Sequence, residues 1–96
     1  MREPLECRLD VDGLRRQRDR YRALGRHATA VERGPGRLTV RFDAEVPAAL
    51  LREAVEVERA CCPFFDLRSG ARELVVTVAD AEHDPALDAI RHALDV

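Results

Sequence analysis

Alternation of apolar and polar residues predicts strands at several places along this 96-residue chain. The clearest case covers residues 37–43, where Leu38, Val40 and Phe42 fall on one face, and residues 73–79 show a similar pattern. Short turns that contain glycine link two pairs of these segments, which predicts two hairpins. Three further strands are expected at residues 4–10, 29–32 and 64–68.

Three other segments repeat apolar residues at the spacing of one helix face, so we expect helices over residues 12–27, 46–62 and 84–95. The order of elements is then βαββαββα. One antiparallel sheet of about five strands with the helices packed on it satisfies this order, and the first six elements match a ferredoxin-like arrangement. We therefore expect residues 1–96 to form a single α+β domain.

Charge is divided unevenly between the two halves of the chain. Residues 1–41 carry eleven Arg and six acidic residues, whereas residues 42–96 carry five Arg and twelve acidic residues. A basic half is typical of nucleic-acid binding, but here the acidic half lies in the same small domain and repels phosphate. The pattern favours complementary contacts within the fold or between subunits of a homo-oligomer, with no nucleic-acid partner.

Cysteine content and hydropathy indicate the compartment. Three cysteines, an odd number, argue against the disulfide framework of a secreted protein and for free thiols in a reducing environment. No apolar run approaches the roughly 20 residues that span a bilayer, and no signal region follows the N-terminus. We expect a cytoplasmic protein with no membrane partner.

The most informative segment is Glu58-Arg59-Ala60-Cys61-Cys62-Pro63-Phe64-Phe65, which places two adjacent cysteines one helical turn after a carboxylate. Thiolates are the ligands that soft metals prefer. A free cysteine also packs as a small hydrophobe, so burial is the alternative interpretation. Helical spacing directs one row to the sheet and places Glu58 and Cys62 in the neighbouring row; the sheet-facing row is Leu50, Ala54, Val57 and Cys61.

The residues around the cysteine pair decide whether the sulfurs converge. Adjacent side chains on a regular helix diverge by about 100°, so they do not reach one ion together. Pro63 changes this geometry because it pushes Cys62 out of the α region into an extended conformation. A ferredoxin-like sheet places its first and fourth strands side by side, which predicts Cys7 as a third thiol. The same topology brings His83 closer to the pair than His27.

Four pieces of the sequence resemble a group of small bacterial proteins of no established activity, which share a Cys-x-Leu start and a Glu-x-x-Cys-Cys-x-Phe core. The pieces are Cys7-x-Leu9, an Arg-rich helix with Tyr21, Arg41-Phe42 and the segment from Glu58 to Phe65. The resemblance covers nearly the whole chain. It implies a heavy-metal resistance setting, and it implies that Cys7, Glu58, Cys61 and Cys62 belong to one site.

Three functions remain open on the sequence. The first is a soft-metal binding module with thiolates from Cys7, Cys61 and Cys62 for Hg(II), Cu(I), As(III) or Zn(II), and with Glu58 nearby. The second is a thiol-based enzyme or redox protein, although a helix C-terminus and Glu58 both disfavour a thiolate. The third is a structural or dimerisation domain whose cysteines only pack.

Overall fold

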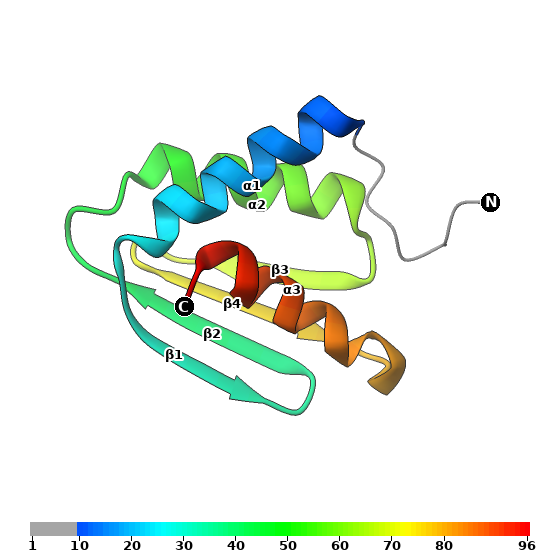
Figure 1. Ribbon diagram of the computed structural model, residues 1–96. Helices are drawn as coiled ribbons and strands as arrows, with labels where there is room; N and C mark the ends of the chain where they lie inside the picture. Colours follow the sequence, from blue (N-terminus) through cyan, green and yellow to red (C-terminus); the bar gives the residue numbers. More distant parts are fainter. Residues whose placement is uncertain (1–9) are drawn as a thin grey trace.

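The structure, a computed structural model, describes residues 10–96 and confirms three helices and four of the predicted strands (Figure 1). The fifth predicted strand, at residues 4–10, lies outside the described residues apart from its last position. A short 3₁₀ turn, Ala81–His83, precedes the last helix. The elements in chain order are α1 (Val11–Gly25), β1 (Ala28–Gly34), β2 (Arg37–Phe42), α2 (Ala48–Cys61), β3 (Phe65–Ser69), β4 (Glu73–Val78) and α3 (Asp84–Leu94).

The four strands form one antiparallel sheet in the order β1-β2-β4-β3. The ferredoxin-like order is not confirmed, because that arrangement places the first strand of the chain between the strands here called β2 and β3. In the described sheet β4 lies there instead and pairs with both neighbours. Leu38, Val76 and Leu67 stand opposite one another across three strands, so this order aligns one apolar row.

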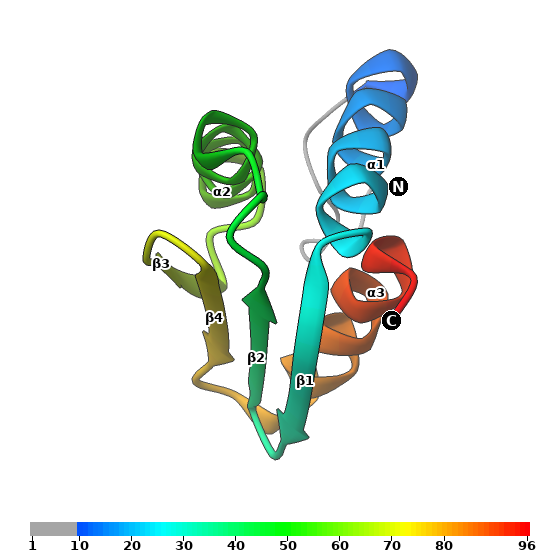
Figure 2. The ribbon, with the colours of Figure 1, turned by 90° about the vertical axis from the view of Figure 1, so that its left-hand side faces the viewer.

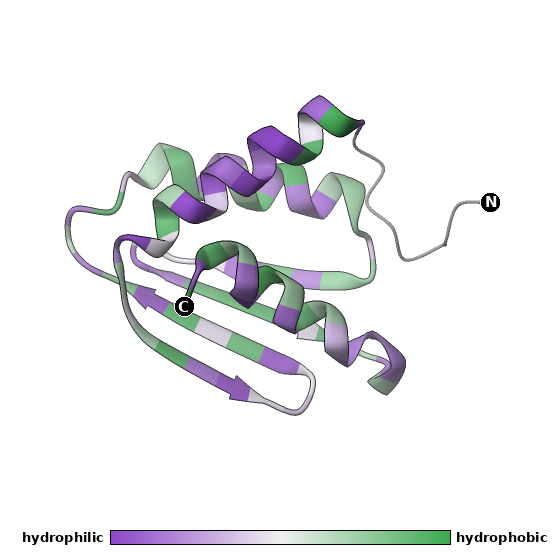
Figure 3. Cartoon of the chain, in the orientation of Figure 1, coloured by the Kyte–Doolittle hydropathy of each residue, from purple (hydrophilic) through white to green (hydrophobic). Residues whose placement is uncertain are grey.

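The helices cover the face of the sheet that carries this apolar row (Figure 1). Helix α2 packs on β3, α3 packs on β2 and β4, and α1 packs on both other helices. Figure 2 shows α1 and α2 side by side, with α3 closer to the strands. The buried apolar residues of these elements form one continuous cluster. In Figure 3 the outward side of α1 is strongly hydrophilic, as the Arg-rich sequence predicts.

A set of ion pairs fixes the start of α3 against the first hairpin. Arg33 on β1 lies 2.9 Å from Asp84 Oδ2 and 2.9 Å from Asp88 Oδ1. The backbone N–H of Gly36 donates to Asp84 Oδ1 at 2.6 Å. The Arg33 hydrogen bonds, followed by that of Gly36, hold the pKa of Asp84 below its usual range. Because α3 lies beside the cysteine site, these ion pairs also position one wall of that site.

Candidate metal centre

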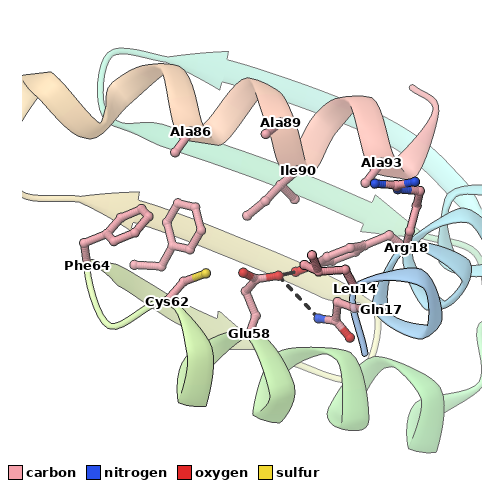
Figure 4. Close-up of a pocket in the computed structure, with 12 residues that line it drawn as sticks. Leu14, Gln17, Arg18, Glu58, Cys62, Phe64, Ala86, Ala89, Ile90 and Ala93 are labelled. Atoms are coloured by element: carbon pink, nitrogen blue, oxygen red, sulfur yellow. Dashed lines mark hydrogen bonds between the residues drawn. The ribbon is translucent and has the colours of Figure 1, made fainter. Parts of the chain in front are cut away.

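Glu58, Cys61 and Cys62 form a buried cluster at the C-terminal end of α2 (Figure 4 shows Glu58 and Cys62). One ligand atom from each lies within 4.8 Å of the other two. The two sulfur atoms are 3.5 Å apart, and the Cys61 sulfur is 3.9 Å from Glu58 Oε2. Two sulfurs on one zinc ion, at about 2.3 Å each, lie at most about 4.6 Å apart. The cluster therefore has the dimensions of a metal site.

The end of α2 brings the two sulfurs together in the way that Pro63 predicts. The helix ends at Cys61, and Cys62 leaves the helical conformation with φ −128° and ψ 78°. The backbone N–H of Cys62 still donates to the carbonyl of Glu58 at 2.8 Å, so the last turn stays closed. A regular helix would have pointed the adjacent side chains apart. The predicted convergence of Cys61 and Cys62 is confirmed.

The two cysteines differ in their chemical state. Cys61 is disulfide-bonded, whereas Cys62 carries a free thiol. Burial, and then a hydrogen bond and the charge of Glu58, raise the pKa of the Cys62 thiol far above its ordinary value. A neutral buried thiol is a poor nucleophile, while a bound cation would deprotonate it. A metal site at this position requires the reduced form of Cys61.

Two side chains of α1 hold the Glu58 carboxylate in place. The Tyr21 hydroxyl donates to Glu58 Oε1 at 2.6 Å, and Gln17 Nε2 reaches the same oxygen at 3.3 Å (Figure 4). Gln17 also donates to the carbonyl of Ala54 at 2.9 Å and accepts from Arg20 at 2.8 Å. Burial, followed by the Glu58 carboxylate, raises the pKa of Tyr21 well above its usual value, so Tyr21 stays a donor.

The contacts that α1 makes with α2 correct part of what the sequence predicted for this site. Glu58 was expected at the margin of the buried row, but it is itself buried and only 6% exposed. Leu50 and Val57, expected to face the sheet, are half-buried, because α1 as well as the sheet covers α2. Gln17 was missed altogether. Its spacing could have indicated its role, because Gln17 shares one helix face with Tyr21, which lies one turn later.

A cavity of about 230 Å³, partly open to solvent, adjoins the cluster and lies between α1, α2 and α3. Figure 4 shows the Cys62 sulfur and the Glu58 carboxylate pointing into this space from the α2 side. Phe64 and Ile90 are among the residues on its other walls. The cavity thus combines a mostly apolar lining with a sulfur and a carboxylate on one side.

Two other sequence predictions concern residues around the cluster. Cys7, the predicted third thiol, lies outside the described residues. The His83 ring contacts the Phe64 ring in a tilted arrangement with 4.7 Å between the ring centroids, whereas His27 pairs with Asp43 at 2.9 Å. His83 is therefore linked to the cavity through Phe64, which lines it. Within residues 10–96 neither histidine belongs to a group that could hold a metal ion.

Comparison of the chain with models of protein families, with curated proteins and with solved structures found no match. Function is therefore argued from the site itself. The helices of residues 10–96 include none that is long and apolar enough to cross a membrane. The fold and site define a small α+β protein with a buried carboxylate and two convergent sulfurs.

Proposed function

We propose that the reduced protein binds one soft or borderline metal ion through Cys61, Cys62 and Glu58. The observation that carries the proposal is the convergence of two sulfurs and a carboxylate within 4.8 Å of one another in a buried position. Soft thiolate ligands select ions such as Hg(II), Cu(I), As(III) and Zn(II). Cys7, the remaining cysteine of the sequence, supplies a third sulfur in this proposal.

The surroundings of the site suit a cation better than a free thiolate. The C-terminal end of α2 carries partial negative charge, and Glu58 adds a carboxylate beside the sulfurs. Both features attract a cation and oppose ionisation of Cys62 in the absence of one. They also argue against a nucleophilic cysteine, so binding is favoured over thiol catalysis. The proposed site needs the reduced form of Cys61, which a reducing compartment such as the cytoplasm would maintain.

The carboxylate is oriented before any ion arrives. Hydrogen bonds from neighbouring side chains fix metal-binding groups and typically change metal affinity by about 10-fold to 100-fold when removed. Tyr21 and Gln17 make such bonds to one oxygen of Glu58. The second oxygen, Oε2, faces the Cys61 sulfur at 3.9 Å. One oxygen is thus held by α1 while the other stays directed at the sulfurs.

Native mass spectrometry of the protein tests this function. The protein is kept reduced by a non-thiol reductant and titrated with Zn²⁺ or Hg²⁺, and we expect one ion per chain. Cys62→Ser and Cys61→Ser should each abolish stoichiometric binding, and Cys7→Ser tests the third sulfur in the same way. Glu58→Gln should weaken binding, whereas Glu56→Gln, on the exposed side of the same helix, is the matched control.

Cysteines that only pack would give a different result. In that case the Ser variants would lose stability while the metal titration of the wild-type protein showed no saturation at one equivalent. Unchanged affinity in both Cys61→Ser and Cys62→Ser would likewise overturn the metal proposal.

A further inference from the structure

The cavity beside the cluster is lined very differently from the cluster itself. Its sulfur and carboxylate come from Cys62 and Glu58, both on one side. The opposite side is the apolar face of α3, and aromatic rings close one end (Figure 4). The α1 side adds the polar side chains of Gln17, Arg18 and Tyr21. The apolar lining residues include Leu14, Phe64, Phe65, Ala86, Ile90 and Ala93.

A bare hydrated ion uses only part of this site. The ligand atoms of Cys61, Cys62 and Glu58 lie close together, and the adjoining cavity offers the ion mostly apolar side chains, which bind water poorly. An ion that already carries one carbon substituent matches both sides at once. The metal meets the Cys62 sulfur and the Glu58 carboxylate, and the organic group takes the place of water in the apolar space.

We propose that this site accepts a monosubstituted soft metal, R–M, in which M is a thiophilic ion such as Hg(II) and R is a small apolar group. The inference rests on the proposed metal binding and adds the ligand class. The cavity volume of about 230 Å³ is adequate for R, since apolar cavities of about 150 Å³ bind benzene. A phenyl group therefore fits between Phe64 and the α3 face.

The binding step is a ligand exchange with no oxidation or reduction. An organomercury thiolate, R–Hg–SR′, meets the Cys62 thiol of the reduced protein. The Hg–SR′ bond breaks and a bond from Hg to Cys62 Sγ forms, while the thiol proton passes to the departing R′S⁻ and gives R′SH. The Hg–C bond is untouched. Glu58 lies beside the metal as an additional ligand.

Exchange equilibria with glutathione complexes test the proposal. The reduced protein is titrated with the glutathione complexes of phenylmercury and of methylmercury, and the exchange constants are measured by native mass spectrometry. Both sides of each exchange contain one Hg–S bond, so the strength of that bond largely cancels. Burial of the larger apolar surface should favour phenylmercury over methylmercury by about tenfold or more.

A variant that fills the cavity should remove this preference. Ala86 is half-buried on the α3 wall, and Ala86→Leu occupies the space proposed for R without changing a sulfur or the carboxylate. Ala93→Leu does the same from another lining position. Ala48→Leu, at the exposed first residue of α2, is the matched control. In the filled variants we expect about equal exchange constants for phenylmercury and methylmercury. In the control the preference for phenylmercury should persist.

The outcomes separate the two proposals. Stoichiometric Hg²⁺ binding together with equal exchange constants for phenylmercury and methylmercury would overturn the ligand class alone. A phenyl preference that survives in both filled variants would place R elsewhere and would also overturn it. Absence of stoichiometric Hg²⁺ binding would overturn the proposed function itself. The comparison of ligands on the wild-type protein decides the matter even where a filled variant fails to fold.

Discussion

The Tyr21–Glu58 hydrogen bond joins α1 to the candidate metal centre, and Tyr21→Phe removes its donor without changing the ring. Tyr21 is 4% exposed and Glu58 is 6% exposed, so the change leaves a buried carboxylate oxygen with one hydrogen-bond donor fewer. Hydrogen bonds to charged groups contribute about 1.5–3 kcal/mol. Gln17 still reaches the same oxygen at 3.3 Å and offsets part of the loss. We expect the variant to lose about 2 kcal/mol of unfolding free energy.

Urea unfolding of the reduced, metal-free protein measures this loss, and a metal titration measures its functional consequence. Because Tyr21 orients the carboxylate, affinity for the ion should fall by about 10-fold to 100-fold. Thr77→Val is the matched control, since the Thr77 hydroxyl donates to Asp66 at 3.4 Å in an exposed position. Its stability should change by less than about 0.5 kcal/mol. A Tyr21→Phe protein that equals the wild type in both stability and metal affinity would refute the reasoning.

Three further predictions follow from local geometry. A Cβ at Gly25 would lie 1.7 Å from the Leu94 carbonyl oxygen, so Gly25→Ala should cost about 1–3 kcal/mol in urea unfolding; Gly34→Ala, with open space around it, should cost far less. Pro63→Ala should weaken metal binding in a titration with little loss of stability, because the helix can then continue and separate the sulfurs; unchanged affinity would contradict this. The raised pKa of Cys62 keeps its thiol protonated in the folded state while the unfolded state ionises, so the stability of the reduced protein should fall as pH rises above about 8.5. Cys62→Ala should flatten this fall, and an identical pH dependence would contradict the assignment.

Much of the fold follows from periodicity in the sequence. Alternation at Leu38, Val40 and Phe42 predicted a strand with one buried face, and all three side chains are buried. Helical spacing placed the three helices within a few residues of their observed ends. The strand order was harder to predict from the sequence, because it depends on which strands β4 pairs with across the fold. Local patterns record that a strand has an apolar face, but they do not record its neighbours.

The candidate site, too, could be predicted from the sequence only in part. The spacing of Glu58, Cys61 and Cys62 along one helix end, together with Pro63, predicted a local cluster that the structure reproduces. The network that holds the carboxylate could not be predicted, because Gln17 comes from another helix and contacts Glu58 only after the helices pack. The cavity is equally nonlocal, since its walls belong to all three helices.

X-ray absorption spectroscopy of the reduced protein with one equivalent of Hg²⁺ tests the central claim most directly, because it counts the sulfur atoms bound to the ion. We expect at least two sulfurs per ion in the wild-type protein and loss of the stoichiometric Hg–S signal in Cys62→Ser. A single sulfur per ion in the wild-type protein, or the same sulfur count in Cys62→Ser, would contradict the claim that the two convergent cysteines bind one metal ion.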